Sequence, residues 1–481
     1  MAIHAVPSKV PVKNRIGLLT LSDARSKVHN SLLTVVEDYN DRLVSALEAT
    51  GEVEVVPGSA PVNSPDAARQ EATRLLYAGV TGTIFHQPIF GFPSYGVIVA
   101  QILPPPFLIL APRDPNYPSF NGLIALGAAF AQLEIPHARV WGDIQDEGTL
   151  LQVLRFIRAV SAVRRLRGQV YGMLGGRSLG LYGNAPAPNL WIRKFGVDVD
   201  HADEFEIVRR AKSVTPEQVK AGVKWLAAQT SGIHYDDRQL TVSKFEHQVR
   251  AYLATKEIIT DYGWDFLGVK CHFEMSEYFV TQCLTASLLN DPYDWDGPKE
   301  PTVISCEADS DGALTMQIMK LLTGHPVSLN DIRFFDKDTG LWVLVNCGAS
   351  PTWFAARSDD PAENLGKTAL VPTITKYAGG GAHVCFQFRE GPVTLARLQR
   401  SGDDYQLVVL NGQIEEKPLN NVRGEVENWP VAYVRLNVSD DTLVQKLNAN
   451  HLHMVTGDLI EELELVAKFL GIEVVKPATI S

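Results

Sequence analysis

The feature that most constrains this fold is the regular alternation of short apolar runs with amphipathic stretches over residues 15–168. Each amphipathic stretch places its apolar residues at helical spacing, and Ser64 followed by Pro65 is typical of a helix start. Strands that alternate with helices in this way predict a doubly wound parallel sheet with helices on both faces. The expected strands are residues 15–21, 53–56, 82–86, 107–111 and 138–141.

A second α/β unit is expected from residue 169, where a strand-like run leads into a glycine-rich turn at Gly175 and Gly176. This turn departs from the GxGxxG fingerprint, and no acid follows a second strand at the right place, so a tight structural turn is favoured over a nucleotide site. A nicotinamide dehydrogenase is therefore the weakest of the alternatives. Further along, Thr215 and Gln218 have the spacing of a capping box, and residues 242–262 form a long helical pattern.

After about residue 339 the chain becomes rich in strand-like runs separated by Gly, Asp, Asn and Pro turns, which predicts a largely antiparallel domain. These runs are residues 341–346, 370–377, 382–389, 405–410 and 431–436, followed by a helix after Asp458 and a last strand at 472–475. The predicted fold class is α/β: two doubly wound, Rossmann-like domains followed by a β-rich, barrel-like domain. The expected boundaries are 1–168, 169–338 and 339–481.

Length and composition agree with a multidomain globular protein. The 481 residues are too many for one ordinary core, and 45% of them are hydrophobic. The formal charge of −11 argues against general nucleic-acid binding. We expect no membrane association and a cytoplasmic location, because no apolar stretch is long enough to cross a membrane and the N-terminus lacks an apolar leader core. The five cysteines form no CxxC pair, which favours buried thiols.

Residues 298–331 hold the strongest functional candidates. A short apolar run at 302–306 ends at Glu307, a helical pattern covers 312–322, and a second short strand at 326–329 ends at Asp331. Ligands of open α/β sheets collect at the carboxyl ends of strands, so the two acids are expected at two such ends, close enough to share a cation. Without further information, helix-capping or solvated loop acids are the commoner explanation.

Three sequence motifs include the two acids or follow them. They are Asp294-Trp295-Asp296-Gly297 with Glu300-Pro301 before Glu307-Ala308-Asp309-Ser310, then Asn330-Asp331-Ile332-Arg333, and finally Ala449-Asn450-His451. On these motifs the chain resembles the L-fucose/L-arabinose isomerase superfamily, and its L-fucose isomerase branch in particular. The motifs occur in family order, with compatible spacing, and together they are much more specific than any one of them.

The resemblance implies a metal-dependent aldose–ketose isomerase that works through a cis-enediol. Carried over residue by residue, Glu307 and Asp331 would be both metal ligands and acid/base groups, and His451 would be the third ligand. The implied metal is Mn²⁺, with Mg²⁺ or Co²⁺ as substitutes, and carboxylates with one imidazole suit such hard cations. Taken alone, His451 would be better explained as a core histidine.

Four further residues are expected to contact substrate. Asn450 matches a family residue beside the histidine ligand, whereas His272 and Cys347 stand where the family has glutamine and serine. The family's substrate-contacting arginine near the N-terminus is absent, and Arg25 is a candidate replacement, with a surface arginine as the alternative. These exchanges leave the implied metal ligands intact, so we expect isomerase chemistry on a sugar other than L-fucose.

The alternatives concern substrate and turnover. The same site could serve an acidic, sulfonated or deoxy sugar, or the chain could be a sugar-binding homologue without catalysis. The partners expected are a monosaccharide and further copies of the chain, in a hexamer or another trimer-based assembly by analogy. In such an assembly His86, at a strand end of the first domain, could reach a neighbouring site. His383 is expected to be structural, because three glycines precede it.

Overall fold

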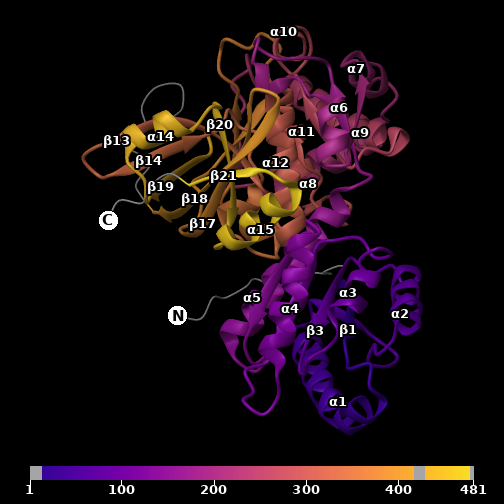
Figure 1. The fold of residues 1–481 in the computed structure, drawn as a ribbon. Helices are drawn as coiled ribbons and strands as arrows, with labels where there is room; N and C mark the ends of the chain where they lie inside the picture. The colour runs from indigo at the N-terminus through magenta and orange to yellow at the C-terminus, as the bar shows by residue number, and fades with distance from the viewer. Residues whose placement is uncertain (1–12, 417–427, 477–481) are drawn as a thin grey trace. The chain divides into compact units, whose positions relative to one another are not determined.

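The computed structural model describes residues 13–416 and 428–476, which divide into two compact units. The N-terminal unit runs to Arg165 and includes Glu464–Phe469, and the second unit covers Leu166–Leu463 and the chain after Leu470 (Figure 1). Among the residues described, no helix combines the length and apolar character needed to span a bilayer.

The N-terminal unit contains the predicted parallel sheet of five strands. Their order is β2-β1-β3-β4-β5, so the strand order reverses beside β1, as in doubly wound folds. All five expected strands are confirmed, with ends that shift by at most one residue. They are β1 (Asn14–Thr20), β2 (Val53–Pro57), β3 (Gly82–His86), β4 (Phe107–Ala111) and β5 (His137–Trp141).

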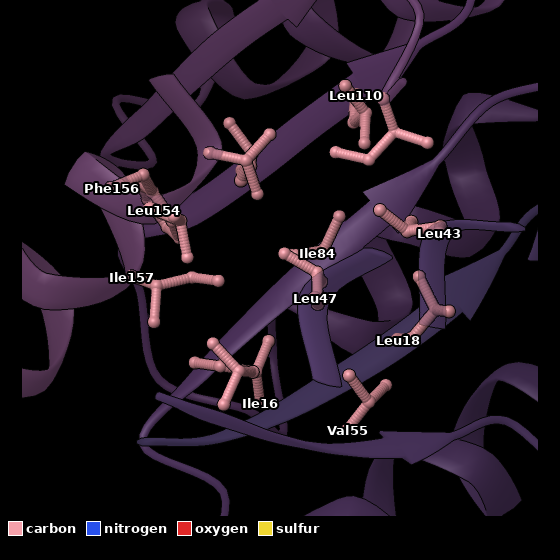
Figure 2. Close-up of a cluster of buried hydrophobic side chains, with 14 of the residues drawn as sticks. Ile16, Leu18, Leu43, Leu47, Val55, Ile84, Leu110, Leu154, Phe156 and Ile157 are labelled. Carbon is pink, nitrogen blue, oxygen red and sulfur yellow. The ribbon is translucent and has the colours of Figure 1, made fainter. Parts of the chain in front are cut away.

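Alternating side chains of these strands form two separate cores, one on each face of the sheet. Ile16 and Leu18 pack with helices α1 (Ser26–Ala49) and α5 (Glu147–Leu166), as Figure 2 shows. Leu19 points to the opposite face, in a cluster with side chains of the three remaining helices. The doubly wound prediction is therefore confirmed. Those helices are α2 (Pro65–Tyr77), α3 (Pro93–Val99) and α4 (Ser119–Gln132).

The second unit begins with a smaller parallel sheet in the order β12-β9-β6-β7. Gly175 directly follows β6 with φ +87°, a backbone conformation that suits the predicted tight turn, and Thr215 forms the predicted capping box with Gln218. The strands are β6 (Val170–Leu174), β7 (Asp198–Ala202), β9 (Phe266–Val269) and β12 (Ile304–Ser305). The accompanying helices are α6 (Pro188–Lys194), α7 (Phe205–Ala211), α8 (Pro216–Gln229), α9 (Val242–Tyr262), α10 (Glu274–Tyr278), α11 (Cys283–Asn290) and α12 (Ser310–Thr323).

The same unit continues into a sheet of seven strands in the order β17-β20-β13-β14-β19-β18-β21. Because β17 also pairs with β18, the first six strands close into a ring, and the barrel-like prediction is confirmed. The strands are β13 (Ser328–Asp336), β14 (Leu341–Val345), β17 (Gly391–Ser401), β18 (Asp404–Glu415), β19 (Val431–Leu436), β20 (His451–Thr456) and β21 (Glu473–Val475). Smaller elements are β8 (Gly232–Ile233), β10 (Tyr293–Asp294), β11 (Gly297–Pro298), β15 (Ala369–Pro372), β16 (Ala382–Cys385), α13 (Pro361–Leu365), α14 (Asp440–Lys446) and α15 (Ile460–Leu470).

The structure corrects two strand predictions in this region. The strand expected at 326–329, ending at Asp331, is instead β13, a nine-residue strand that continues to Asp336. Asp331 therefore lies inside an antiparallel strand of the barrel, where it pairs with His451 and Val345, and not at the end of a strand in the α/β sheet. A long strand, β17, begins at Gly391 between the runs expected at 382–389 and 405–410, where no strand was predicted.

Candidate active site

Glu307 lies where the sequence placed it, directly after a strand of the parallel sheet. β12 ends at Ser305, and the turn Cys306–Ala308 follows, with φ +59° at Glu307 and +51° at Ala308. A left-handed conformation costs a residue with a Cβ about 1–2 kcal/mol. The carbonyl oxygen of Glu307 accepts a hydrogen bond of 2.7 Å from the Asn184 amide. Two consecutive residues in this conformation are typical of a turn kept for a functional purpose.

The carboxylates of Glu307 and Asp331 both lie close to Nε2 of His451. His451 is the first residue of β20 and pairs directly with Asp331 on β13. Its Nε2 atom lies 3.5 Å from Oδ1 of Asp331 and 3.8 Å from Oε2 of Glu307. The structure therefore brings together, from three elements and two sheets, the three residues that the resemblance implied as metal ligands.

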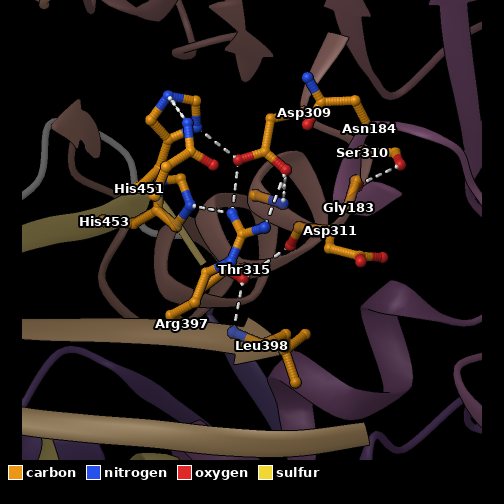
Figure 3. A network of polar contacts seen from close by, with 12 residues as sticks. Gly183, Asn184, Asp309, Ser310, Asp311, Thr315, Arg397, Leu398, His451 and His453 are labelled. Carbon is orange, nitrogen blue, oxygen red and sulfur yellow. Dashed lines mark hydrogen bonds and ion pairs between the residues drawn. The ribbon is translucent and has the colours of Figure 1, made fainter. Parts of the chain in front are cut away.

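The other ring nitrogen of His451 is held by a buried ion pair. Nδ1 lies 2.8 Å from Oδ2 of Asp309, and the guanidinium of Arg397 on β17 contacts both oxygens of that carboxylate, at 2.5 and 3.0 Å (Figure 3). Asp309 also accepts the backbone N–H of Gly312 as the N-cap of α12. A histidine whose second nitrogen contacts a carboxylate has a fixed orientation, as is usual for metal-ligating histidines. Here the fixed ring turns Nε2 toward Glu307 and Asp331.

Most of the charged groups around Glu307 are negative. Burial, together with the negative charges of Asp331 and Asp309, raises the pKa of Glu307 to about 7, although His451 opposes the shift. Burial also works against the charged form of His451, but Asp309 and Asp331 outweigh it and raise its pKa to about 10. The pKa of Asp309 is held well below its usual range, because the charge of Arg397 and the bond to His451 outweigh its burial. Added positive charge beside Glu307 would therefore be stabilising.

The donor atoms fit a hard divalent cation in kind. Over residues 13–416 and 428–476, no group of three or more His, Cys, Asp or Glu side chains is already spaced as ligands of one metal ion. Neighbouring ligands of an octahedral site with bonds of about 2.1 Å lie about 3.0 Å apart. The separations of 3.5 and 3.8 Å at Nε2 of His451 are somewhat wider. Two carboxylates and an oriented imidazole are the ligand types that Mn²⁺ and Mg²⁺ accept.

Of the four expected substrate contacts, Asn450 and Cys347 lie near this cluster, and His272 lies near Cys347. The amide Nδ2 of Asn450 is 3.0 Å from Nε2 of His451. His272 is buried, with Nε2 3.5 Å from the hydroxyl of Tyr377, and burial lowers its pKa. Cys347 lies close enough to Glu307 for its charge to contribute to the raised pKa of that carboxyl.

Cys347 itself has an unusual environment. Hydrogen bonds from the thiols of Cys283 and Cys306 hold the pKa of Cys347 well below its usual range. The imidazole of His272 is among the charges that favour its ionised form. The position where the resembled family has a serine is therefore surrounded by other sulfur atoms.

The remaining candidates are not brought to this cluster by the described contacts. Arg25 belongs to the N-terminal unit, its side chain is 73% exposed, and it pairs with Asp23 at 2.6 Å. His86 is buried in the same unit, with Nδ1 2.8 Å from the amide oxygen of Asn40, and burial lowers its pKa to about 3. His383 is buried, with Nε2 3.0 Å from the carbonyl oxygen of Asn428.

The sequence interpretation missed the residues behind His451. Asp309 lies within the motif that contains Glu307, two residues further on, and its N-cap position gave the one available signal. Arg397 lies on β17, a strand that was not predicted. The apolar pattern therefore could not indicate that this charged residue is buried. His453, two residues after His451 on the same face of β20, has Nε2 3.0 Å from Arg397.

Comparisons with known proteins identify the family of the chain. Three family models match: the first N-terminal domain of L-fucose isomerase over residues 13–168, its second N-terminal domain over 266–324 and its C-terminal domain over 344–477. Sulfoquinovose isomerase from Priestia aryabhattai is 23% identical over 406 residues, covering 81% of this chain and 84% of the relative. L-fucose isomerase from Streptococcus pneumoniae serotype 2 is 22% identical over 547 residues, covering 96% and 92%. With the residues of its three motifs gathered at one site, the chain belongs to the L-fucose isomerase family.

Proposed function

We propose that this protein is an aldose–ketose isomerase that acts on a monosaccharide with a divalent cation held by Glu307, Asp331 and His451. The observation that supports this most directly is the convergence of both carboxylates on Nε2 of His451, at 3.5 and 3.8 Å. The relatives named above, an L-fucose isomerase and a sulfoquinovose isomerase, support the same reaction class.

The two carboxylates suit the proton transfers of this reaction. An aldose and its ketose differ by a hydrogen that moves between C1 and C2, so a base must stand beside each carbon of the cis-enediol. Without a cation, burial raises the pKa of Glu307 to about 7, and a bound cation would lower it and favour the carboxylate form that acts as a base. Asp331 approaches from a different strand, and its side chain is 40% exposed, which leaves it open to a ligand. We assign proton transfer at the two carbons to these two residues.

The remaining residues of the cluster orient the ligands. Asp309 and Arg397 hold the ring of His451 at Nδ1, and Asn450 lies beside Nε2. We propose Mn²⁺ as the cation, with Mg²⁺ or Co²⁺ as substitutes, because the site offers oxygen and imidazole donors. When bound, such a cation supplies Lewis-acid polarisation of the sugar carbonyl and stabilises the negative charge that develops on its oxygen.

The sugar contacts are proposed at Asn450, His272, Cys347 and Arg25. The family positions of His272 and Cys347 carry glutamine and serine, so the hydrogen-bond pattern offered to the sugar differs from that of an L-fucose isomerase. We therefore propose a sugar other than L-fucose. A sulfonated sugar is the favoured alternative, because sulfoquinovose isomerases are among the relatives found over most of the chain.

Location and assembly are proposed on separate grounds. All five cysteines are free, which supports a reducing compartment, and we propose the cytoplasm. The resemblance supports a homo-oligomer, a hexamer or another trimer-based ring, and size-exclusion chromatography with light scattering would determine its mass.

The test is an isomerisation assay on metal-stripped protein reloaded with Mn²⁺, Mg²⁺ or Co²⁺. A panel of aldoses that includes L-fucose and sulfoquinovose is incubated in D₂O, and NMR follows ketose formation and deuterium uptake at C1 and C2. Glu307→Gln should abolish turnover while the fold is retained. The matched control is Glu217→Gln, an exposed acid in the first turn of α8, which should behave as the wild type.

The outcomes separate the alternatives. Turnover of one sugar that requires a cation and Glu307 supports the proposal and names the substrate. A sugar that raises the melting temperature without deuterium uptake indicates a binding protein with this fold instead. If no cation stabilises the protein and no cation supports turnover, the proposed ligand set is wrong.

A further inference from the structure

Four of the five cysteines gather beside Glu307 from distant parts of the chain. Within the second unit the sulfur of Cys347 is hydrogen bonded to the thiols of Cys283 and Cys306. Cys271 lies close enough to influence both of those thiols. We call these four residues the thiol cluster. The fifth cysteine, Cys385, is free like the others but contributes to none of these contacts.

The members of the thiol cluster differ in how far they are buried. Cys271, Cys283 and Cys306 are buried, whereas Cys347 is half-buried. Cys347 follows β14 in the short segment before Gly348, which has φ +107°. Cys347 is therefore the member of the cluster that is partly exposed as a residue.

Each neighbour of Cys347 comes from a different element. Cys283 is the first residue of α11, and its thiol also donates to the carbonyl oxygen of Cys347 at 3.5 Å. Cys306 begins the turn that contains Glu307. The thiols that hydrogen bond to Cys347 therefore come from a helix start and from the turn of Glu307.

We propose that Cys347 is an oxidation site at which a hydroperoxide converts the thiol cluster into a disulfide. The sulfur of Cys347 attacks the peroxide, the O–O bond breaks, and Cys347 becomes a sulfenic acid while the peroxide is reduced to an alcohol or water. The thiol of Cys283 or Cys306 then attacks this sulfur, an S–S bond forms, and the sulfenic oxygen leaves as water. Two electrons pass from the two sulfurs to the peroxide, and no other reactant is required. The thiol of Cys283 also contacts the carbonyl oxygen of Cys347, so we favour Cys283 as the cysteine that forms the disulfide.

The disulfide would act on the proposed active site directly. Cys306 directly precedes Glu307, so a bond to Cys306 would constrain the turn that holds this carboxylate, and a bond to either cysteine would remove the charge of Cys347 that acts on it. We expect isomerase activity to fall in proportion to the fraction of protein that carries the disulfide, and to return on reduction. This effect on activity rests on the proposed function, whereas formation of the disulfide does not.

The test is peroxide titration of the reduced full-length protein, followed by peptide mapping under non-reducing conditions. The expected product is a peptide that links Cys347 to Cys283 or Cys306. Cys347→Ser should lose it, and Cys385→Ser, the matched control, should retain it. A thiol reagent should also label Cys347 of the wild type faster than the other three members of the cluster, a measurement that needs no variant.

The results that would overturn the proposal are equally direct. They are the absence of a linked peptide in the wild type, or oxidation of Cys347 no faster than that of Cys385. If no sugar is converted but the linked peptide forms, the proposed function fails and the oxidation site stands. If activity falls without the linked peptide, the oxidation site fails.

Discussion

Nδ1 of His451 lies 2.8 Å from Oδ2 of Asp309, and neither side chain is exposed by more than 2%. Asp309 is also the N-cap of α12 and the partner of Arg397, so a helix, a barrel strand and the candidate metal histidine meet at one carboxylate. The orientation of His451 therefore depends on how the barrel packs against the α/β sheet. This explains how a ligand from the end of the chain is positioned beside Glu307.

Asp309→Asn should weaken the site without removing a proposed ligand. The amide cannot hold the His451 ring as the carboxylate does, and loss of such a partner typically costs about 10–100-fold in metal affinity or activity. Isothermal titration with Mn²⁺ would measure the affinity, and the assay above would measure turnover.

Asp311→Asn is the matched control for this change. Asp311 is buried two residues away, where it pairs with Arg400 and accepts the hydroxyl of Tyr405 at 2.7 Å. Its loss should affect stability but leave Mn²⁺ affinity close to that of the wild type. Equal losses of affinity in the two variants would contradict the orienting role of Asp309.

Arg397→Met should destabilise the second unit strongly. The guanidinium is 2% exposed and its carboxylate partner is fully buried, so the change removes one of the two positive groups that contact this buried carboxylate and leaves only His451. Breaking a buried pair in this way costs about 3–5 kcal/mol. Chemical denaturation would measure the loss. Arg400→Met removes a pair whose arginine is 26% exposed and should cost clearly less; a similar loss in both would contradict the argument.

The sequence predicted the α/β part of the fold well because its signals are local. Apolar runs, the cap at Thr215 and the turn at Gly175 each depend on a few neighbouring residues, and the structure agrees with each. The barrel was predicted as a class, but β17 and β20 were missed. Their side chains face other strands of a closed ring, so burial there depends on pairings between residues far apart in the chain.

The candidate site shows the same difference between local signals, which were predicted, and contacts between distant residues, which were not. The place of Glu307 follows from local signals, since a strand ends and a helix begins around it. Asp331 was assigned to the wrong sheet, yet pairing of β13 with β20 still brings it to His451. The partnership of Asp309 with Arg397 spans 88 residues, and the thiol cluster joins positions up to 76 residues apart in numbering (347 minus 271). No periodicity within one element can indicate such contacts.

Gly348→Ala should be more destabilising than its backbone conformation alone predicts. Gly348 has φ +107°, and an added Cβ would meet the Cβ of His383 at 2.1 Å. Gly297 has φ +117° but open space around the added atom, so Gly297→Ala is a control for the backbone strain. We expect Gly348→Ala to lose about 1–3 kcal/mol more than this control, as overpacked sites do. Urea denaturation of both variants tests the difference, and equal losses would show that the segment beside Cys347 adapts freely.

Glu204 should make the protein less stable as the pH rises. Its side chain is buried and accepts the backbone N–H of Cys271 at 2.8 Å, and burial raises the pKa of Glu204 to about 7. Between the unfolded value of about 4.3 and this folded value, the folded state keeps a proton that the unfolded state has released. The stabilising contribution is therefore complete below about pH 4.3 and is lost as the pH rises through about 7.

Glu204→Gln keeps a carbonyl oxygen for Cys271 but removes the titration. The wild type should lose about 2 kcal/mol relative to this variant between about pH 5.5 and pH 8, since each pKa unit is worth about 1.4 kcal/mol. Urea denaturation at the two pH values gives the difference, with Glu217→Gln as an exposed control that should follow the wild type. Parallel curves for wild type and Glu204→Gln would mean that Glu204 ionises normally in the folded protein, and that water reaches its carboxylate beside Cys271.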